Sequence, residues 1–341
     1  MKKVTLIVLL SLLSIQISFA TSWRINNKVG IDANFTSLQQ ANDSSAVHNG
    51  DTIYCENGAF VGSATISKQL FIIGPGYFLA QVDTSYANPS SSSVNEITFA
   101  SGSDGSTITG MRITGYIKFD YCNSITVERC KIKTVTDGNF GNSDGDNFVI
   151  RQCYIYNSIG LTRTKSIDIY NNIILGAISI GANYTNQVTI ENNVIVYNTS
   201  NVAIQTDDCN CANNIICTSG SVYSLGANNS TFSKNVVVKY PNSTSAITQT
   251  QPSGTNIWGT VTMDSVFVED GAPDAYYQLK TGSPAIGYCQ NNKDAGAFEG
   301  VYEYILSGFP MYFPRIYEDL STGSATSSGI PIHIKAKSQS K

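Results

Sequence analysis

Charged residues are scarce in this chain of 341 residues, at 13% of the sequence, about half the share of an ordinary globular protein. The formal net charge is −4, and loss of Lys2 and Lys3 with a leader would make it −6 (−4 − 2). Basic residues gather only in the tail, at Lys335, Lys337 and Lys341. Nucleic-acid binders carry a basic patch or stripe, so this composition argues against a nucleic-acid partner.

Long apolar runs are also lacking, with one exception at the start of the chain. Lys2 and Lys3 precede the apolar run Val4–Leu13, and Ser18-Phe19-Ala20 supplies small residues for cleavage. This order predicts a secretory signal peptide over residues 1–20, with a mature chain that begins at Thr21. The run is too short for a membrane-spanning helix, and no cysteine follows it as a lipoprotein anchor would require. We expect an exported protein without a transmembrane segment, located in the periplasm, on the outer surface or outside the cell.

The eight cysteines form no CxxC pair and no histidine-spaced pair, so the sequence does not predict a zinc site. Cys130, Cys153, Cys209 and Cys211 fall on structural positions of the repeat described next, where a small buried hydrophobe fits. We therefore expect buried thiols. Cys130 and Cys153 lie one repeat apart and are the one pair for which a disulfide is geometrically conceivable.

What the sequence does contain is a repeat of about twenty residues between Ile125 and Trp258. Each unit reads apolar, any, apolar, two spacers, a special residue, any, apolar. The special positions are separated by 23, 19, 21, 21, 21 and 21 residues and are occupied in turn by Cys130, Cys153, Asn172, Asn193, Asn214, Asn235 and Asn256. A fixed period in this range indicates a solenoid.

The repeat favours strands over helices. Each unit has two short alternating runs, such as Ser166–Tyr170 and Ile173–Leu175, and a third run such as Ala177–Ile180. Asparagine tolerates the left-handed backbone of a tight bend. Three strands in about twenty residues make one coil of a parallel β-helix, in which the asparagines would stack as a hydrogen-bonded ladder. The leucine signature and helical half of a leucine-rich repeat are missing.

We therefore predict an all-β fold, a single-stranded right-handed parallel β-helix with an N-terminal cap and a short C-terminal extension. The cap would occupy residues 21–49 with a short helix near Phe35–Asn42. The solenoid and its closing segment would occupy residues 50–300, and the extension residues 301–341, ending in one strand at Ile330–Ala336.

The two ends of the chain carry a family resemblance. Trp23–Asn27, Gly50–Tyr54 and Gly74–Leu79 resemble the opening of exported right-handed parallel β-helix repeat proteins of Bacteroidetes type. Ser283–Gly287 and Asp294–Phe298 resemble the closing motif of that group. The resemblance implies the pectin lyase-like superfamily, which includes polysaccharide lyases, hydrolases and members without known activity. Fold alone does not choose among them.

Two sets of residues are candidates for catalysis. Hydrolases of the superfamily use paired acids beside a Gly-His-Gly motif; the chain has Asp207 and Asp208, but neither of its two histidines stands in such a motif. Lyases need a base and a cation beside a uronate carboxylate, and Arg163 and Lys165 are candidates for these roles. Plain turn residues are the alternative for both sets. If the protein is an enzyme, the sequence favours a lyase over a glycoside hydrolase.

Further residues are candidates for binding. Asp144 and Asp146 could supply oxygen ligands to calcium, although the segment departs from a twelve-residue calcium loop and Asp-Gly is ordinary in turns. Calcium is the one cofactor that the sequence suggests. Tyr184, Gln205 and Tyr223 could contact a glycan along the edge of the third strands. Two functions stay open: a non-catalytic binder of a polysaccharide or cell-surface glycan, and an enzyme that cleaves an acidic glycan.

Overall fold

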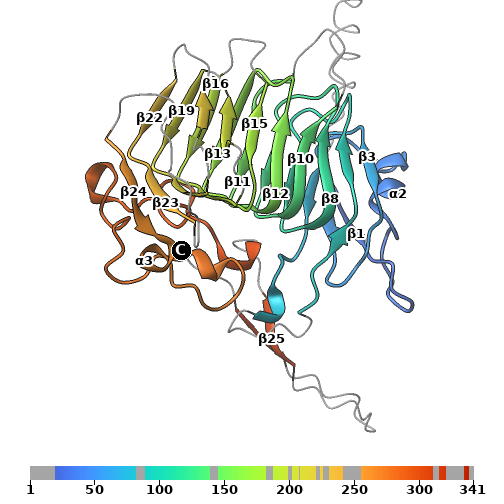
Figure 1. Ribbon diagram of the computed structural model, residues 1–341. Helices are drawn as coiled ribbons and strands as arrows, with labels where there is room; N and C mark the ends of the chain where they lie inside the picture. The colour runs from blue at the N-terminus through green and yellow to red at the C-terminus, as the bar shows by residue number, and fades with distance from the viewer. Residues whose placement is uncertain are drawn as a thin grey trace, which may run out of the picture.

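The computed structural model describes residues 20–81, 89–138, 145–181, 187–198, 202–206, 208–219, 223–225, 230–240, 255–309, 315–319 and 334–337. Its main body is a stack of parallel coils that progresses along one axis from the N-terminal residues to β23 (Figure 1). The prediction of an all-β parallel β-helix is confirmed.

The first sheet has ten parallel strands, one from each coil, and it forms one wall of the stack. Its strands are β1 (Ser22–Ile25), β2 (Thr52–Cys55), β4 (Phe71–Ile73), β7 (Thr107–Thr109), β9 (Thr126–Glu128), β11 (Phe148–Arg151), β13 (Ser166–Tyr170), β16 (Gln187–Glu191), β19 (Cys209–Ala212) and β22 (Thr231–Ser233). Apolar side chains alternate inward along these strands, as at Ile167 and Ile169.

The second sheet has fourteen strands and combines the second and third strands of the coils. Its members are β3 (Ala64–Ile66), β5 (Ser93–Val94), β6 (Ile97–Phe99), β8 (Arg112–Phe119), β10 (Lys131–Asp137), β12 (Tyr154–Leu161), β14 (Ile173–Ile174), β15 (Ile178–Ile180), β17 (Val194–Tyr197), β18 (Ile204–Thr206), β20 (Ile215–Thr218), β21 (Tyr223–Leu225), β23 (Val236–Lys239) and β24 (Ile257–Thr262). β10 and β12 each combine the second and third strands of one coil. Their pairing shifts register between Ile132 and Thr134 of β10, where the second strand passes into the third.

An asparagine ladder forms the corner between the two sheets. The residue before each ladder position has a left-handed backbone, with φ of 53° at Asn171, 55° at Asn192 and 59° at Asn213. The ladder asparagines face inward. Asn193 Oδ1 accepts from Asn172 N of the preceding coil, and Asn193 N and Nδ2 donate to Asn214 Oδ1 of the following coil. The predicted ladder is therefore confirmed, including its half-buried end at Asn256.

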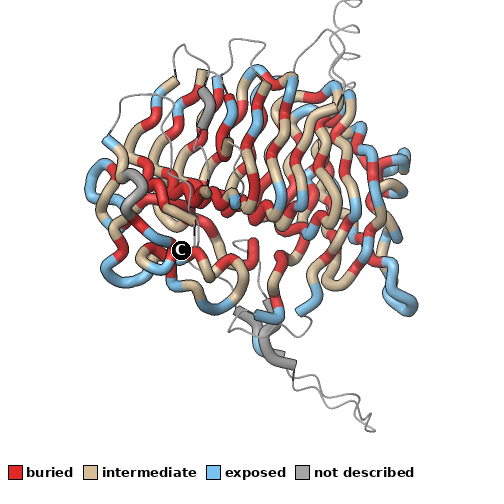
Figure 2. The backbone as a smooth tube through the Cα atoms, in the orientation of Figure 1, coloured by how far each residue is buried: buried red, intermediate tan, exposed pale blue. Residues whose placement is uncertain are grey.

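The interior of the coils is a continuous apolar core (Figure 2). All eight cysteines are buried and unbonded, so the Cys130–Cys153 pair is not a disulfide. Burial raises the pKa of the Cys153 thiol to about 12. Its backbone N–H donates to Asn172 Oδ1 at 2.9 Å, which places this thiol at the position that asparagine occupies in later coils.

The N-terminal segment supplies the first strand of the ten-stranded sheet in addition to the short helix of the predicted cap. Helix α2 (Leu38–Asp43) lies where a short helix was expected, with the Ser37 hydroxyl accepting from Gln40 N at 3.1 Å. However, β1 pairs along its whole length with β2. The sheet therefore starts at Ser22, inside the segment that was predicted to be only a cap.

The C-terminal segment differs from the prediction that it closes the last coil. Residues 263–309, here named the strap, fold back along the outer surface of the second sheet toward the N-terminal coils (Figure 1). The Asn171 amide donates to Ala297 O at 2.9 Å, and Tyr77 N donates to Ser307 O at 2.7 Å, near the start of the stack. The strap contains short helical turns only: α3 (Met263–Val266), η2 (Ala275–Tyr277), η3 (Gln290–Asn292) and η4 (Leu306–Gly308).

The described part of the tail forms a small antiparallel pair. β26 (Ile334–Lys337) overlaps the predicted C-terminal strand Ile330–Ala336. It pairs with β25 (Arg315–Asp319), which was not predicted. One further short helical turn, η1 (Leu79–Gln81), lies between β4 and β5 along the chain.

Candidate functional site

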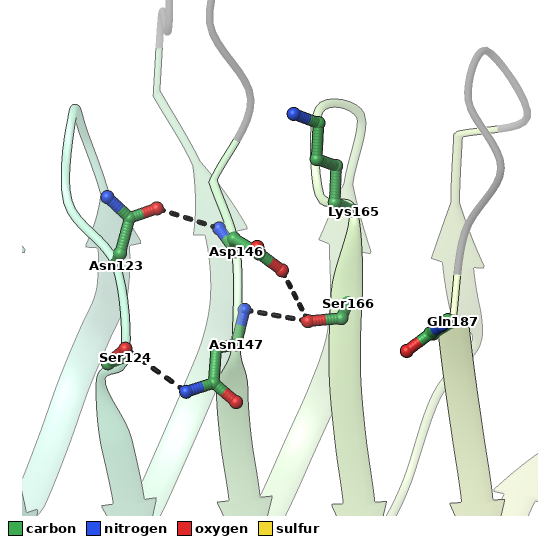
Figure 3. Close-up of a pocket in the computed structure, with 7 residues that line it drawn as sticks. All are labelled: Asn123, Ser124, Asp146, Asn147, Lys165, Ser166 and Gln187. Carbon is green, nitrogen blue, oxygen red and sulfur yellow. Dashed lines mark hydrogen bonds between the residues drawn. The ribbon is translucent and has the colours of Figure 1, made fainter.

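A polar groove of about 760 Å³ lies at the edge where the chain enters the first sheet (Figure 3). It crosses four successive coils, those of β9, β11, β13 and β16. The residues that line it are Asn123, Ser124, Asp146, Asn147, Lys165, Ser166 and Gln187. Amides and hydroxyls predominate, with one carboxylate and one ammonium group.

Hydrogen bonds between coils fix the inner row of this groove. Asn147 Nδ2 donates to Ser124 Oγ at 3.1 Å, and Asn147 N donates to Ser166 Oγ at 2.8 Å. The backbones of Ser124 and Asn147 are both left-handed, with φ of 56° and 60°. Asparagine tolerates this conformation, but it is uncommon for serine, and the hydrogen bonds between coils hold both residues in it. The inner row is therefore a preformed set of polar groups.

The outer row of the groove is formed one residue earlier in each coil. Asp146 N donates to Asn123 Oδ1 at 3.0 Å, and the Asp146 carboxylate accepts from the Ser166 hydroxyl. Lys165 is held by its backbone, whose N–H donates to Gly145 O at 2.8 Å and whose carbonyl accepts from Gln187 N at 2.8 Å. The Lys165 side chain extends beyond the strand ends, whereas the Asp146 carboxylate points toward Ser166 (Figure 3).

The structure brings together two of the predicted site residues, Asp146 and Lys165, in this groove. Asp208 lies one coil beyond Gln187 along the same edge. Its carbonyl accepts from Val188 N, which belongs to the preceding coil. Arg163 is bonded through its backbone N–H to Asp137 Oδ2 at 2.6 Å and does not line the groove.

The remaining predicted residues do not join this group. Gln205 is exposed on β18, on the face of the third strands. Asp144, Tyr184 and Asp207 lie outside the described residues, and for Tyr223 the description covers the backbone alone.

The face of the third strands carries mainly hydroxyl groups. Thr136 pairs in register with Gly160, and Ser179 pairs with Gly160 and with Gln205. Lys118, on the neighbouring strand, forms an ion pair with Asp120 at 3.3 Å. The Asp137 carboxylate, at the end of β10, accepts from Thr162 N at 2.5 Å and from Arg163 N at 2.6 Å, so it is bonded to the backbone of the next coil.

Calcium binding has one described candidate ligand in the groove, Asp146. Among the residues that the structure describes, no three histidine, cysteine, aspartate or glutamate side chains cluster as metal ligands would. The groove could still offer amide and hydroxyl oxygens beside this carboxylate, and such oxygens are ligands of hard cations.

Four residues of the groove were not predicted as site residues, although the sequence carries a signal for them: Ser124, Asn147, Ser166 and Gln187. They are separated by 23, 19 and 21 residues, the same spacings as the ladder positions six residues later. Polar residues before a strand resemble ordinary turn chemistry, and only the register of the coils shows that they form one row.

Comparisons with known proteins add no identification. No family model matches the chain, and no curated protein matches it. Within the described residues, no helix is long and apolar enough to cross a membrane.

Proposed function

We propose that this protein is a non-catalytic glycan-binding scaffold that holds a hydroxyl-rich saccharide in the polar groove. The observation that carries the proposal is the composition of the groove: side-chain amides and hydroxyls from four coils form a preformed row. Amide and hydroxyl groups both donate and accept hydrogen bonds, which matches the hydroxyl groups of a sugar. A row that repeats from coil to coil suits a ligand that itself repeats.

A glycan array with the mature protein tests this proposal. We expect binding to a subset of saccharides, and we expect Gln187→Ala to abolish it, because this side chain lies exposed in the groove. Gln205→Ala is the matched control, since it removes the same group from an exposed position on the third strands. Loss of binding on Gln205→Ala with retention on Gln187→Ala would contradict the groove as the site.

A polysaccharide lyase is the second candidate function, favoured by Lys165 beside Asp146 in the same groove. A lysine could remove the proton α to a uronate carboxylate, and a cation near Asp146 could neutralise that carboxylate. Incubation with pectate, alginate or chondroitin, with calcium present, would then produce unsaturated uronate. Product formation that Lys165→Ala abolishes would overturn the non-catalytic proposal.

The proposal includes export, which rests on the predicted signal peptide at residues 1–20. Most of that segment lies outside the described residues. The parallel coils and the end motifs support membership of the pectin lyase-like superfamily of Bacteroidetes type as part of the same proposal. Secreted protein whose first residue is Met1 would contradict it.

A further inference from the structure

A second pocket, of about 510 Å³, lies past the ladder corner, at the other end of the first-sheet strands from the polar groove. It is bordered by the outer surface of β8 and β10 and by the segment around η1. Three cationic side chains line it, those of Lys28, Arg112 and Lys131. This concentration of positive charge stands out in a chain whose net charge is negative.

Two of these cations lie side by side on neighbouring strands. Lys131 of β10 pairs in register with Arg112 of β8, so both side chains leave the same face of the sheet. Like charges at directly opposed positions destabilise a sheet. Among the described residues, neither side chain forms an ion pair, and the same holds for Lys28. An anion between them would remove the repulsion.

Aromatic rings hold the Lys131 ammonium group in place. Its Nζ lies 4.2 Å from the centre of the Phe78 ring and 5.7 Å from that of Tyr156. The Tyr156 hydroxyl is fixed in turn by donation to Thr114 O at 3.0 Å. Phe78 has a left-handed backbone with φ of 51°, an uncommon conformation for a bulky residue.

The electrostatics of Lys131 agree with this arrangement. Partial burial, and then the charge of Arg112, lower the pKa of Lys131, while the charge of Asp274 opposes the shift. A partly desolvated cation interacts strongly with an arriving anion, because little water has to be displaced and screening is weak.

A sequence pattern explains why the pocket lies at this point of the solenoid. In the coils from β8 onward, the position in register with Lys131 is Arg112, Lys131 and Tyr154, and then Ile173, Val194 and Ile215. The apolar members lie beneath the strap. The cations occur near the end of the strap, where it contacts Tyr77. The same register position therefore packs against the strap in the later coils and lines the pocket in the early ones.

We propose that this pocket binds an acidic saccharide through its carboxylate or sulfate group. Arg112 can donate two parallel hydrogen bonds to such a group, and Lys131 supplies an oriented point charge. The rest of the lining includes Gln81, Ser90 and Ser91, whose polar groups suit sugar hydroxyls better than an apolar ligand. The pocket is separate from the polar groove, and it does not depend on the function proposed for that groove.

Calorimetric titration of the mature protein tests the proposal. The probes are an oligogalacturonate, a sulfated chondroitin oligosaccharide, a neutral xylo-oligosaccharide of similar length, and inorganic phosphate. We expect saturable binding of at least one acidic oligosaccharide and none of the neutral one. Lys131→Met and Arg112→Gln should each weaken that binding by about tenfold or more, because each removes a charged hydrogen-bonding partner.

Lys133→Met is the matched control, because it removes an exposed lysine from the same strand without touching the pocket lining. We expect it to leave the affinity unchanged, as should Gln187→Ala in the polar groove. Equal affinity for neutral and acidic oligosaccharides, equal binding of inorganic phosphate alone, no binding of any probe, or an equal loss in Lys133→Met would each overturn the proposal.

Discussion

At the scale of single residues, the ladder asparagines stabilise the corner because one side chain serves several groups. Asn193 Oδ1 accepts from Asn172 N at 2.9 Å and from Asn172 Nδ2 at 3.0 Å. Its own Nδ2 donates to Ile169 O at 2.8 Å and to Asn214 Oδ1 at 3.0 Å. The side chain is fully buried, so water cannot replace these partners.

Replacement of Asn193 by leucine should therefore destabilise the protein clearly more than the same change at Asn256. Leucine keeps a similar volume, but every partner left without a bond costs about 1–3 kcal/mol. Asn256 also bonds Asn235, yet it is half-buried at the end of the ladder. Water can therefore replace part of its bonds. Denaturant unfolding of both variants measures the difference, and equal, small losses would contradict a buried ladder.

At the scale of elements, a close approach between coils requires glycine at one corner. Gly110 precedes a corner position and has φ of 68°, but Arg129 has φ of 50° at the equivalent place in the next coil. The left-handed backbone alone therefore does not require glycine. A Cβ atom on Gly110 would lie 2.3 Å from Gly74 O, a backbone atom that cannot move aside cheaply.

Gly110→Ala should consequently cost more than Gly50→Ala, which serves as its matched control. Gly50 also has a left-handed backbone, with φ of 89°, but a Cβ there would meet nothing within 4 Å. Alanine at Gly50 should cost roughly 1–2 kcal/mol for the backbone conformation alone. Gly110→Ala adds the clash between coils. Thermal unfolding of both variants tests this. Equal decreases in melting temperature would show that the coils accommodate a Cβ atom at Gly110 without loss of stability.

The regular elements were predictable from sequence, whereas the strap was not. The spacing of Cys130 through Asn256 predicts the coils because each coil repeats the same local contacts. The strap has no period of its own, and its packing against Ile173, Val194 and Ile215 is visible only in three dimensions. Similarly, Asp146 and Lys165 were identified by chemical type, but their common groove required knowledge of which coils are neighbours.

At the scale of the whole molecule, the strap makes distant coils depend on one another. It buries an apolar stripe along the second sheet, and the backbone there is buried in Figure 2. Residues from two parts of the strap also form a buried polar chain next to Tyr77. In that chain, Asp274 accepts from Ser307 N at 2.6 Å and from the Tyr304 hydroxyl at 3.2 Å. The Tyr304 hydroxyl lies 2.5 Å from that of Tyr77, which belongs to the solenoid.

Asp274 should make stability depend on pH through this contact. Burial raises the pKa of its carboxyl above the ordinary value, in spite of the hydrogen bonds that it accepts. The folded protein therefore holds a proton that the unfolded chain has already released. Stability is fully present below the unfolded pKa of about 3.9, and it declines as the pH rises through the higher folded pKa.

Asp274→Asn removes the ionisation but keeps an oxygen that can accept from Ser307 N and Tyr304. The variant should gain in melting temperature relative to the wild type as the pH rises from about 4 to 8, because it lacks the proton release that weakens the wild type. Asp274→Ala is the contrasting variant. It leaves both donors unsatisfied and should lose about 1–3 kcal/mol at every pH. A pH-independent difference between Asp274→Asn and the wild type would show that Asp274 does not ionise within this range, and would contradict the proposed pH dependence of the strap.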